Sequence, residues 1–197
     1  MRGRTTPGLT AELLVRAYQN GIFPMAKSKN GPIEWFSPDP RCIIPIEEFH
    51  VPRSLRRLVE RSVFQITANV AFSTVISACA RRQDTWISPE IVRAYTELHA
   101  MGYAHSIEAW LDERCVGGLY GVAIGAAFFG ESMFSEFPNA SKVCLVHLVQ
   151  LLRQRGCKLL DSQIINDHIA QFGAIEISRD EYLVRLREAL ACAPILT

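Results

Sequence analysis

The residues best suited to chemistry stand where an apolar run turns polar, in the stretch KLLDSQIINDH at residues 158–168. A carboxylate, Asp161, is followed two residues later by an amide, Gln163. Alternate side chains of a strand share a face, so we expect Asp161 and Gln163 to point the same way and Ser162 the opposite way. The amide then accepts a hydrogen bond from an attacking amine while the carboxylate holds its NH₂ group. A strand-end Asp that caps the following turn is the alternative, and the residues alone leave both open.

A second carboxylate, Glu131, follows Gly130 at the end of another apolar strand. Burying an unpaired charge there is costly, so we expect a cationic partner. That partner is either an Arg or Lys of a bound substrate or, in a structural ion pair, Lys142. His105 and His168 are bases by type, but we interpret both as structural, with Asp167–His168 tying the turn after the strand.

The overall composition sets few limits on function. The chain has 197 residues, of which 49% are hydrophobic, enough for one full core. Its six cysteines are far apart and form no CxxC pair, so we expect neither a metal nor a cofactor. The longest apolar stretch, VAIGAAFF, is far shorter than the roughly 20 residues of a membrane span, and the N-terminus lacks an apolar signal core. These features predict a cytoplasmic protein with no membrane partner.

Charge is distributed unevenly along a chain whose net charge is only +1. Residues 1–82 contain 12 Lys or Arg and 6 Asp or Glu, whereas residues 83–197 contain 9 and 14. A short helix expected at Val51–Ser62 would turn Leu55, Leu58 and Val59 inward and its arginines outward. These arginines, the best candidates for phosphate contacts, are Arg53, Arg56, Arg57 and Arg61. Chance scatter of charge over solvated faces is the alternative.

Periodicity and capping residues predict the remaining elements. A helix at residues 9–20, with Thr10 as N-cap and Gly21 as stop, precedes an irregular segment rich in Pro and aromatic residues at 21–41. A strand from residue 64 and a helix at 72–82 follow, and then a second helix at 88–101, opened by Ser88 and Pro89. Residues 104–135 alternate as three antiparallel strands with a turn at 112–115. A helix at 140–155, capped by Asn139, a strand at 158–163, a short helix at 168–172 and a last helix within 176–190 complete the chain.

This order predicts an α+β fold with a mostly antiparallel sheet. It resembles the N-acetyltransferase-like (GNAT-like) fold, placed here at residues 63–197 as the catalytic domain, after a smaller α/β N-terminal region at residues 1–62. Acetyltransferases cradle the coenzyme A pyrophosphate with a Q/R-x-x-G-x-G/A loop before the long helix. Residues 135–141 read SEFPNAS instead. The architecture is therefore expected without its usual acyl carrier.

Longer motifs carry a closer resemblance. GIFPM, WFSPDPR, TWIS, AHSIEAW, VGGLYGVAIG, FFGESMFS, NASK and LLDSQIINDHIAQFGA occur in the order and spacing of the leucyl/phenylalanyl-tRNA–protein transferase family, from about Leu9 to Leu186. The resemblance implies transfer of Leu or Phe from aminoacyl-tRNA to the N-terminal α-amine of proteins beginning with Arg or Lys. The product is an N-degron for proteolysis, and no coenzyme A or metal takes part. Two rivals are a coenzyme A-dependent N-acetyltransferase on the same fold and a non-catalytic tRNA- or degron-binding adaptor.

The resemblance also implies roles for individual residues. Gln163 receives or relays the amine proton, or only positions the amine, while Asp161 polarises and orients Gln163. Glu131 recognises the acceptor protein, and Trp86 stacks on the terminal adenine of tRNA unless it is a core residue. Apolar side chains form a pocket for Leu, Phe or Met, and two of them, Leu148 and Leu152, widen it towards Phe. The pocket residues are Leu119, Phe128, Met133, Leu145, Leu148, Leu152 and Leu160, which periodicity equally predicts as ordinary core.

Overall fold

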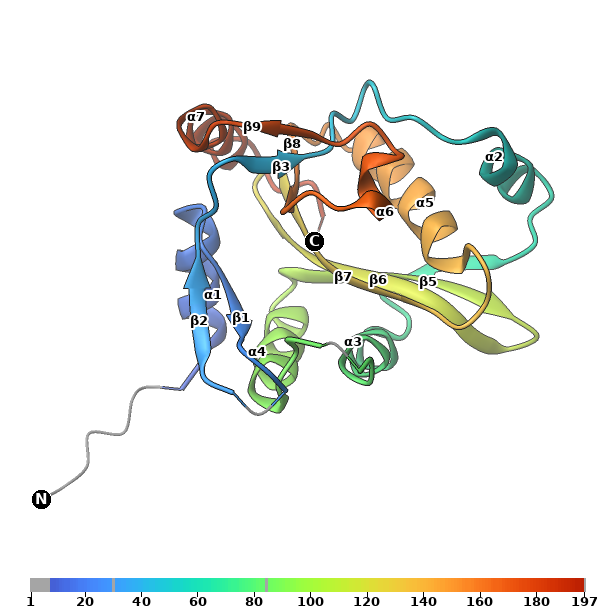
Figure 1. Ribbon diagram of the computed structural model, residues 1–197, viewed down its shortest axis with the longest axis horizontal. Coiled ribbons are helices and arrows are strands. Elements are labelled where there is room, and N and C mark those ends of the chain that lie inside the picture. The colour runs from blue at the N-terminus through green and yellow to red at the C-terminus, as the bar shows by residue number, and fades with distance from the viewer. Residues whose placement is uncertain (1–7, 30, 84, 197) are drawn as a thin grey trace, which may run out of the picture.

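Figure 1 shows a computed structural model of the chain, which describes residues 8–29, 31–83 and 85–196. Its centre is a seven-stranded sheet in the order β4-β5-β6-β7-β8-β3-β9, in which every neighbouring pair is antiparallel except β7 and β8. The expected mixed α/β fold with a mostly antiparallel sheet is confirmed. The strands are β3 (Arg41–Ile43), β4 (Gln65–Ala68), β5 (Ala104–Leu111), β6 (Arg114–Ile124), β7 (Ala127–Ser135), β8 (Leu159–Gln163) and β9 (Ile175–Ile177).

Helices cover both faces of this sheet. α5 (Ala140–Gln154) lies across one face, and α3 (Phe72–Ala80) and α4 (Pro89–Ala100) lie across the other (Figure 1). Because both faces are covered, β5 and β6 are almost continuously buried and do not alternate between apolar and polar residues. The short α2 (Arg53–Glu60) packs on α5, α6 (Asp167–Ala170) follows β8, and α7 (Arg179–Leu190) packs beside β7 and β8.

Three of the helices begin with a side-chain cap. The hydroxyl of Thr10 accepts from the backbone N–H of Leu13 at the start of α1 (Ala11–Gln19), and Ser88 does the same at α4. Ser178 caps α7 in the same way. The expected cap of α5 by Asn139 is wrong, because Asn139 has φ 67° and its side chain makes no capping bond. Ser135 supplies the acceptor instead, 3.2 Å from the N–H of Ser141.

The segment expected to be irregular contains strands. β1 (Phe23–Ala26) and β2 (Ile33–Phe36) pair as an antiparallel hairpin, which the prolines of the segment had disguised. β3 then inserts between β8 and β9, so residues ahead of the expected boundary at residue 62 hydrogen-bond within the large sheet. β9 also occupies residues expected to open the last helix, because Ile177 and its neighbours pair with β3. The division at residue 62 stays a prediction.

Two features are absent from the described part of the chain. No helix there combines the length and the apolar character that crossing a bilayer requires. Nor do three or more His, Cys, Asp or Glu side chains gather there in a way that could hold a metal ion.

Candidate functional site

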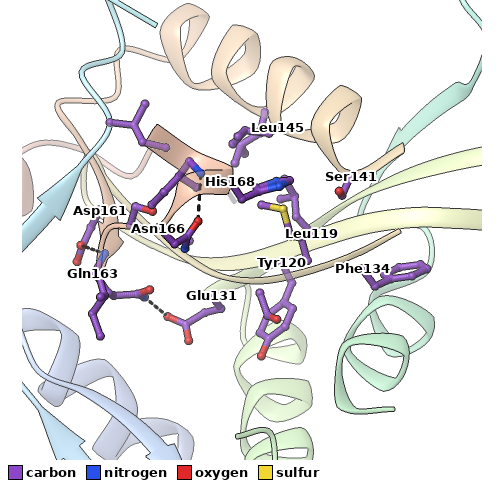
Figure 2. Close-up of a pocket in the computed structure, with 18 of the residues that line it drawn as sticks. Leu119, Tyr120, Glu131, Phe134, Ser141, Leu145, Asp161, Gln163, Asn166 and His168 are labelled. Atoms are coloured by element: carbon purple, nitrogen blue, oxygen red, sulfur yellow. Dashed lines mark hydrogen bonds between the residues drawn. The ribbon is translucent and has the colours of Figure 1, made fainter. Parts of the chain in front are cut away.

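The candidate site is a cavity of about 610 Å³ between β7, β8 and α5. The parallel pairing of β7 and β8 reaches Phe129 and Asp161. Beyond that pair the two strands separate, and side chains from β1, β6, β7, α5, β8 and the segment after β8 line the space between them (Figure 2). The cavity therefore lies where one strand leaves the sheet, and its walls come from segments distant in sequence.

A β-bulge directs Glu131 into this cavity. Tyr120 on β6 pairs with Ser132, and the next residue, Gly121, pairs with Gly130, so Glu131 is the extra residue on β7. A Cβ atom at Gly121 would lie 2.3 Å from the carbonyl oxygen of Phe129, so only glycine fits opposite the bulge. Bulges commonly re-aim a side chain, and here the re-aimed group is a carboxyl in the wall of the cavity.

Gln163 faces Glu131 across the cavity. Its Nε2 donates to Oε1 of Glu131 at 2.8 Å, as Figure 2 shows. The expectation that Asp161 holds this NH₂ group is wrong, because φ of Gln163 is 59° and the regular alternation of the strand ends there. With Nε2 bound to Glu131, the amide oxygen of Gln163 is the part able to accept a further hydrogen bond.

Asp161 is fully buried and already paired. Its carboxylate accepts from Nε of Arg41 at 3.0 Å and from Nη2 at 2.6 Å, and from the hydroxyl of Tyr182 at 2.8 Å. Its Oδ1 also accepts from the backbone N–H of Gln163 at 2.8 Å. Asp161 therefore orients Gln163 through the backbone and not through the amide side chain, a geometry that also matches the turn-capping alternative.

Arg41 was not singled out from the sequence, although it stands in the motif WFSPDPR. Its guanidinium lies 4.8 Å from the ring centre of Phe23 and 4.4 Å from that of Tyr182, and Nη1 donates to the carbonyl of Gly21. Burial and the negative charge of Asp161 raise the pKa of Tyr182, so its hydroxyl stays protonated. The only sequence signal was one arginine in an otherwise apolar strand, which a buried carboxylate elsewhere would have to match.

Glu131 has two further partners that sequence reasoning missed. The hydroxyl of Tyr18 on α1 donates to Oε1 at 2.7 Å, and the hydroxyl of Tyr95 on α4 lies 3.1 Å from Oε2. Burial raises the pKa of Glu131 to about 8, although the bonds to both tyrosines act to lower it. The alternative pairing with Lys142 is wrong, because Nζ of Lys142 donates to Oε1 of Gln171 at 3.0 Å.

The apolar part of the cavity agrees only in part with expectation. Five of the seven expected pocket residues line it: Leu119, Met133, Leu145, Leu148 and Leu160. Phe128 and Leu152 are fully buried but lie outside its lining. Phe128 packs beneath Gly121 within the sheet, and Leu152 lies one helical turn beyond Leu148 in the core. They support the wall and do not form it.

The mouth of the cavity carries an aromatic and a cationic group. Trp86 is half-buried and lines the cavity. Beside it, the exposed Arg82 donates to the carbonyl of Met133 and to the hydroxyl of Ser132, both at 3.2 Å. The four arginines proposed for phosphate contacts are exposed on and just after α2, and none of them lines the cavity: Arg53, Arg56, Arg57 and Arg61.

His168 also lines the cavity, whereas His105 lies outside it on β5. Burial lowers the pKa of His168, which favours the neutral imidazole. The turn after β8 is held by Asn166, whose side chain accepts from the N–H of Ile169 at 3.1 Å, and not by an Asp167–His168 pair.

Comparison with known proteins gives one consistent family. The description "Leucyl/phenylalanyl-tRNA protein transferase" matches residues 43–187, and the N-terminal domain of the same family matches residues 8–39. A leucyl/phenylalanyl-tRNA–protein transferase of Salinibacter ruber is 51% identical over 186 residues, which cover 94% of this chain and 82% of that protein. One of Paramagnetospirillum magneticum is 53% identical over 188 residues, covering 93% and 90%. One of Gloeobacter violaceus is 50% identical over 183 residues, covering 93% and 95%.

Similarity to solved structures is much weaker. The C-terminal domain assigned to a lysylphosphatidylglycerol synthetase from Agrobacterium fabrum is 12% identical, with a TM-score of 0.41, covering 94% of this chain and 60% of that one. The two family matches and the curated relatives agree over nearly the whole chain, and this chain therefore belongs to the leucyl/phenylalanyl-tRNA–protein transferase family of aminoacyltransferases.

Proposed function

We propose that the protein transfers Leu or Phe, and also Met, from aminoacyl-tRNA to the N-terminal α-amine of proteins that begin with Arg or Lys. The product is an N-degron that directs proteolysis in the cytoplasm, and the domain that does this is acetyltransferase-like. The observation that carries the proposal is a single cavity with an apolar end beside α5 and a polar end at Gln163 and Glu131. Such a cavity suits an aliphatic or aromatic amino acid whose ester meets an amine.

The apolar end takes the side chain of the transferred amino acid. Leucine, phenylalanine and methionine all suit walls of Leu and Met, because one methylene changes affinity by only about 1–3 kcal/mol. Leu148 lines this end, and a leucine there leaves more room for a phenyl ring than an aromatic residue would.

The reaction is aminolysis of the ester that joins the amino acid to tRNA. The α-amine has a pKa of about 7.7–8.0, so roughly a tenth of it is neutral at pH 7 without any base. Alignment of the amine with the ester can lower the barrier by about 7–11 kcal/mol. Gln163 contributes by accepting a hydrogen bond from the amine on its free amide oxygen, while Asp161 fixes the backbone of Gln163. The proton leaves through solvent or the departing ribose hydroxyl.

The tRNA approaches from the mouth of the cavity. Trp86 stacks on the terminal adenine, since base–aromatic stacking suits an unpaired 3′ end. The α2 arginines bind phosphates farther along the tRNA, because they lie outside the cavity. Glu131 receives the cationic side chain of the acceptor at the polar end.

The proposal is tested by mixing labelled Leu-tRNA with a peptide that begins with Arg and, separately, with the same peptide beginning with Asp. Label is expected only in the Arg peptide, and Gln163→Ala is expected to slow its entry. Label in neither peptide, together with retained tRNA binding, would favour the non-catalytic adaptor. Acetylation of the Arg peptide by acetyl-CoA would favour the acetyltransferase.

A further inference from the structure

Three oxygen-bearing groups form a closed ring at the polar end of the cavity. Oε1 of Glu131 is 2.7 Å from the hydroxyl of Tyr18, and Oε2 is 3.1 Å from the hydroxyl of Tyr95. The two tyrosine hydroxyls are also in direct contact with each other. Both tyrosines are completely buried and come from different helices, α1 and α4, so packing fixes the ring.

Counting hydrogens shows which form of the carboxyl fits this ring. The ring has three oxygen–oxygen contacts, but the hydroxyls of Tyr18 and Tyr95 supply only two hydrogens. If Glu131 is ionised, one contact has no hydrogen, and two oxygen lone pairs face each other there. A protonated carboxyl supplies the third hydrogen: it donates to Tyr95, which donates to Tyr18, which donates back to Oε1. The observed contacts are therefore those of the neutral acid.

The bond from Gln163 agrees with this assignment. Nε2 of Gln163 donates to the same oxygen, Oε1, that accepts from Tyr18. In the neutral acid Oε1 is the carbonyl oxygen, which has two lone pairs and accepts both bonds. Oε2 then carries the proton towards Tyr95.

The other charged groups around Glu131 do not reverse this preference. Burial raises the pKa of Glu131 to about 8, the hydrogen bonds from Tyr18 and Tyr95 lower it, and the charge of Asp161 raises it while that of Arg41 lowers it. Because Arg41 and Asp161 neutralise each other, little net positive charge reaches the ring. The remaining polar groups of the cavity wall able to carry charge or titrate are Arg82, Tyr120 and His168.

We propose that Tyr18 and Tyr95 are positioning residues that let Glu131 keep a proton in the free enzyme and release it when the cationic side chain of an acceptor binds. The inference rests on the proposed role of Glu131 in acceptor recognition. A guanidinium or ammonium beside Glu131 favours the carboxylate. Both hydroxyls then turn to donate to the carboxylate, and the contact between them opens without movement of carbon atoms. An uncharged acceptor side chain supplies no such drive and meets a neutral acid.

The coupling has a calculable size. A carboxyl that titrates at about pH 8 is about nine-tenths protonated at pH 7 and about one-tenth protonated at pH 9. Binding of a permanently charged guanidinium at pH 7 therefore releases about 0.9 proton. The same binding becomes about tenfold tighter at pH 9, since the competing proton has already left.

Calorimetry with a modified acceptor measures this release. The probe is a peptide beginning with desamino-arginine, which keeps the guanidinium but has no α-amine to titrate. Binding is measured at pH 7 and pH 9 in buffers of different ionisation enthalpy. The wild-type enzyme is expected to release about 0.9 proton at pH 7 and to bind about tenfold more tightly at pH 9. Glu131→Gln is expected to show neither effect.

Tyrosine variants separate the ring from a general structural role. Tyr95→Phe is expected to raise the pKa of Glu131 further, because a hydrogen bond to a carboxylate is stronger than one to a neutral acid. It should also weaken probe binding about tenfold. Tyr103→Phe is the matched control, since its hydroxyl lies outside the ring and its variant should behave as wild type. The carboxyl is followed by carbon-13 NMR of labelled glutamate, assigned by its loss in Glu131→Gln.

The outcomes are distinct for the two proposals. Titration of Glu131 near 4.5 in the free enzyme, or equal proton release by wild type and Glu131→Gln, would overturn the ring proposal even if transfer to the Arg peptide occurs. If the probe does not bind measurably, the NMR titration alone decides. Proton-linked binding without any transfer from Leu-tRNA would instead refute the proposed function and leave the ring in place.

Discussion

The buried pair of Arg41 and Asp161 gives the sharpest quantitative prediction. Both side chains are at most 1% exposed, and they are joined by two hydrogen bonds of 3.0 and 2.6 Å. Asp161→Asn keeps the shape but leaves the guanidinium of Arg41, which cannot lose its proton, without a counter-charge. Removing one partner of a buried pair costs about 3–5 kcal/mol. For a chain of this size that corresponds to a fall in Tm of about 6–20 °C.

Thermal unfolding monitored by circular dichroism measures this effect against two references. Glu181→Gln breaks the exposed pair of Glu181 with Arg185, and should cost no more than about 1 kcal/mol. The double variant Arg41→Met with Asp161→Leu removes both buried charges and should regain most of the lost stability. A Tm of Asp161→Asn within about 2 °C of wild type would refute the electrostatic reasoning.

Activity of the same variants tests what Asp161 does. Asparagine retains an Oδ1 that can accept from the backbone N–H of Gln163, whereas leucine does not. If Asp161 acts by fixing that backbone, Asp161→Asn assayed well below its Tm should keep kcat within about tenfold of wild type. The Arg41→Met, Asp161→Leu variant should lose more than this despite its stability. A loss of several hundredfold in Asp161→Asn would mean that the negative charge itself takes part in catalysis.

Three further predictions concern other parts of the molecule. Gln163→Ala should lower kcat more than it changes the KM for Leu-tRNA in a steady-state assay, because its amide contacts the amine and not the amino acid side chain; equal effects on both would contradict this. Neutralising Arg56 and Arg57 should reduce the salt dependence of tRNA binding by a slope of about 0.7–0.9 for each phosphate that is no longer neutralised, and an unchanged slope would place the tRNA elsewhere. Since the folded-state pKa of Glu131 is raised from 4.5 to about 8, its stabilising contribution is complete below pH 4.5 and is lost as pH rises to 8. The Tm of Glu131→Gln relative to wild type should therefore increase over that range, and a constant difference would show that Glu131 titrates normally.

Local sequence signals were sufficient for most helices and for the central strands. Thr10, Ser88 and Ser178 occupy N-cap positions because a hydroxyl acceptor just ahead of a helical pattern acts within one turn. The strands of residues 104–135 were found for the same reason, since hairpins depend on neighbours in sequence. Such interactions span few residues, so the sequence alone determines them.

The arrangement of the site was decided by contacts between distant segments. Asp161 and Gln163 were found from a two-residue spacing, but the partner of each is remote: Arg41 lies 120 residues from Asp161, and Glu131 lies 32 residues from Gln163. A strand pattern gives no sign of the bulge that aims Glu131 or of the left-handed conformation of Gln163. The sequence by itself therefore determined which groups the site contains, together with most of the elements that carry them. Only tertiary packing decided which carboxyl is buried in an ion pair and which faces the cavity, because desolvation and hydrogen-bond partners depend on segments that meet in space.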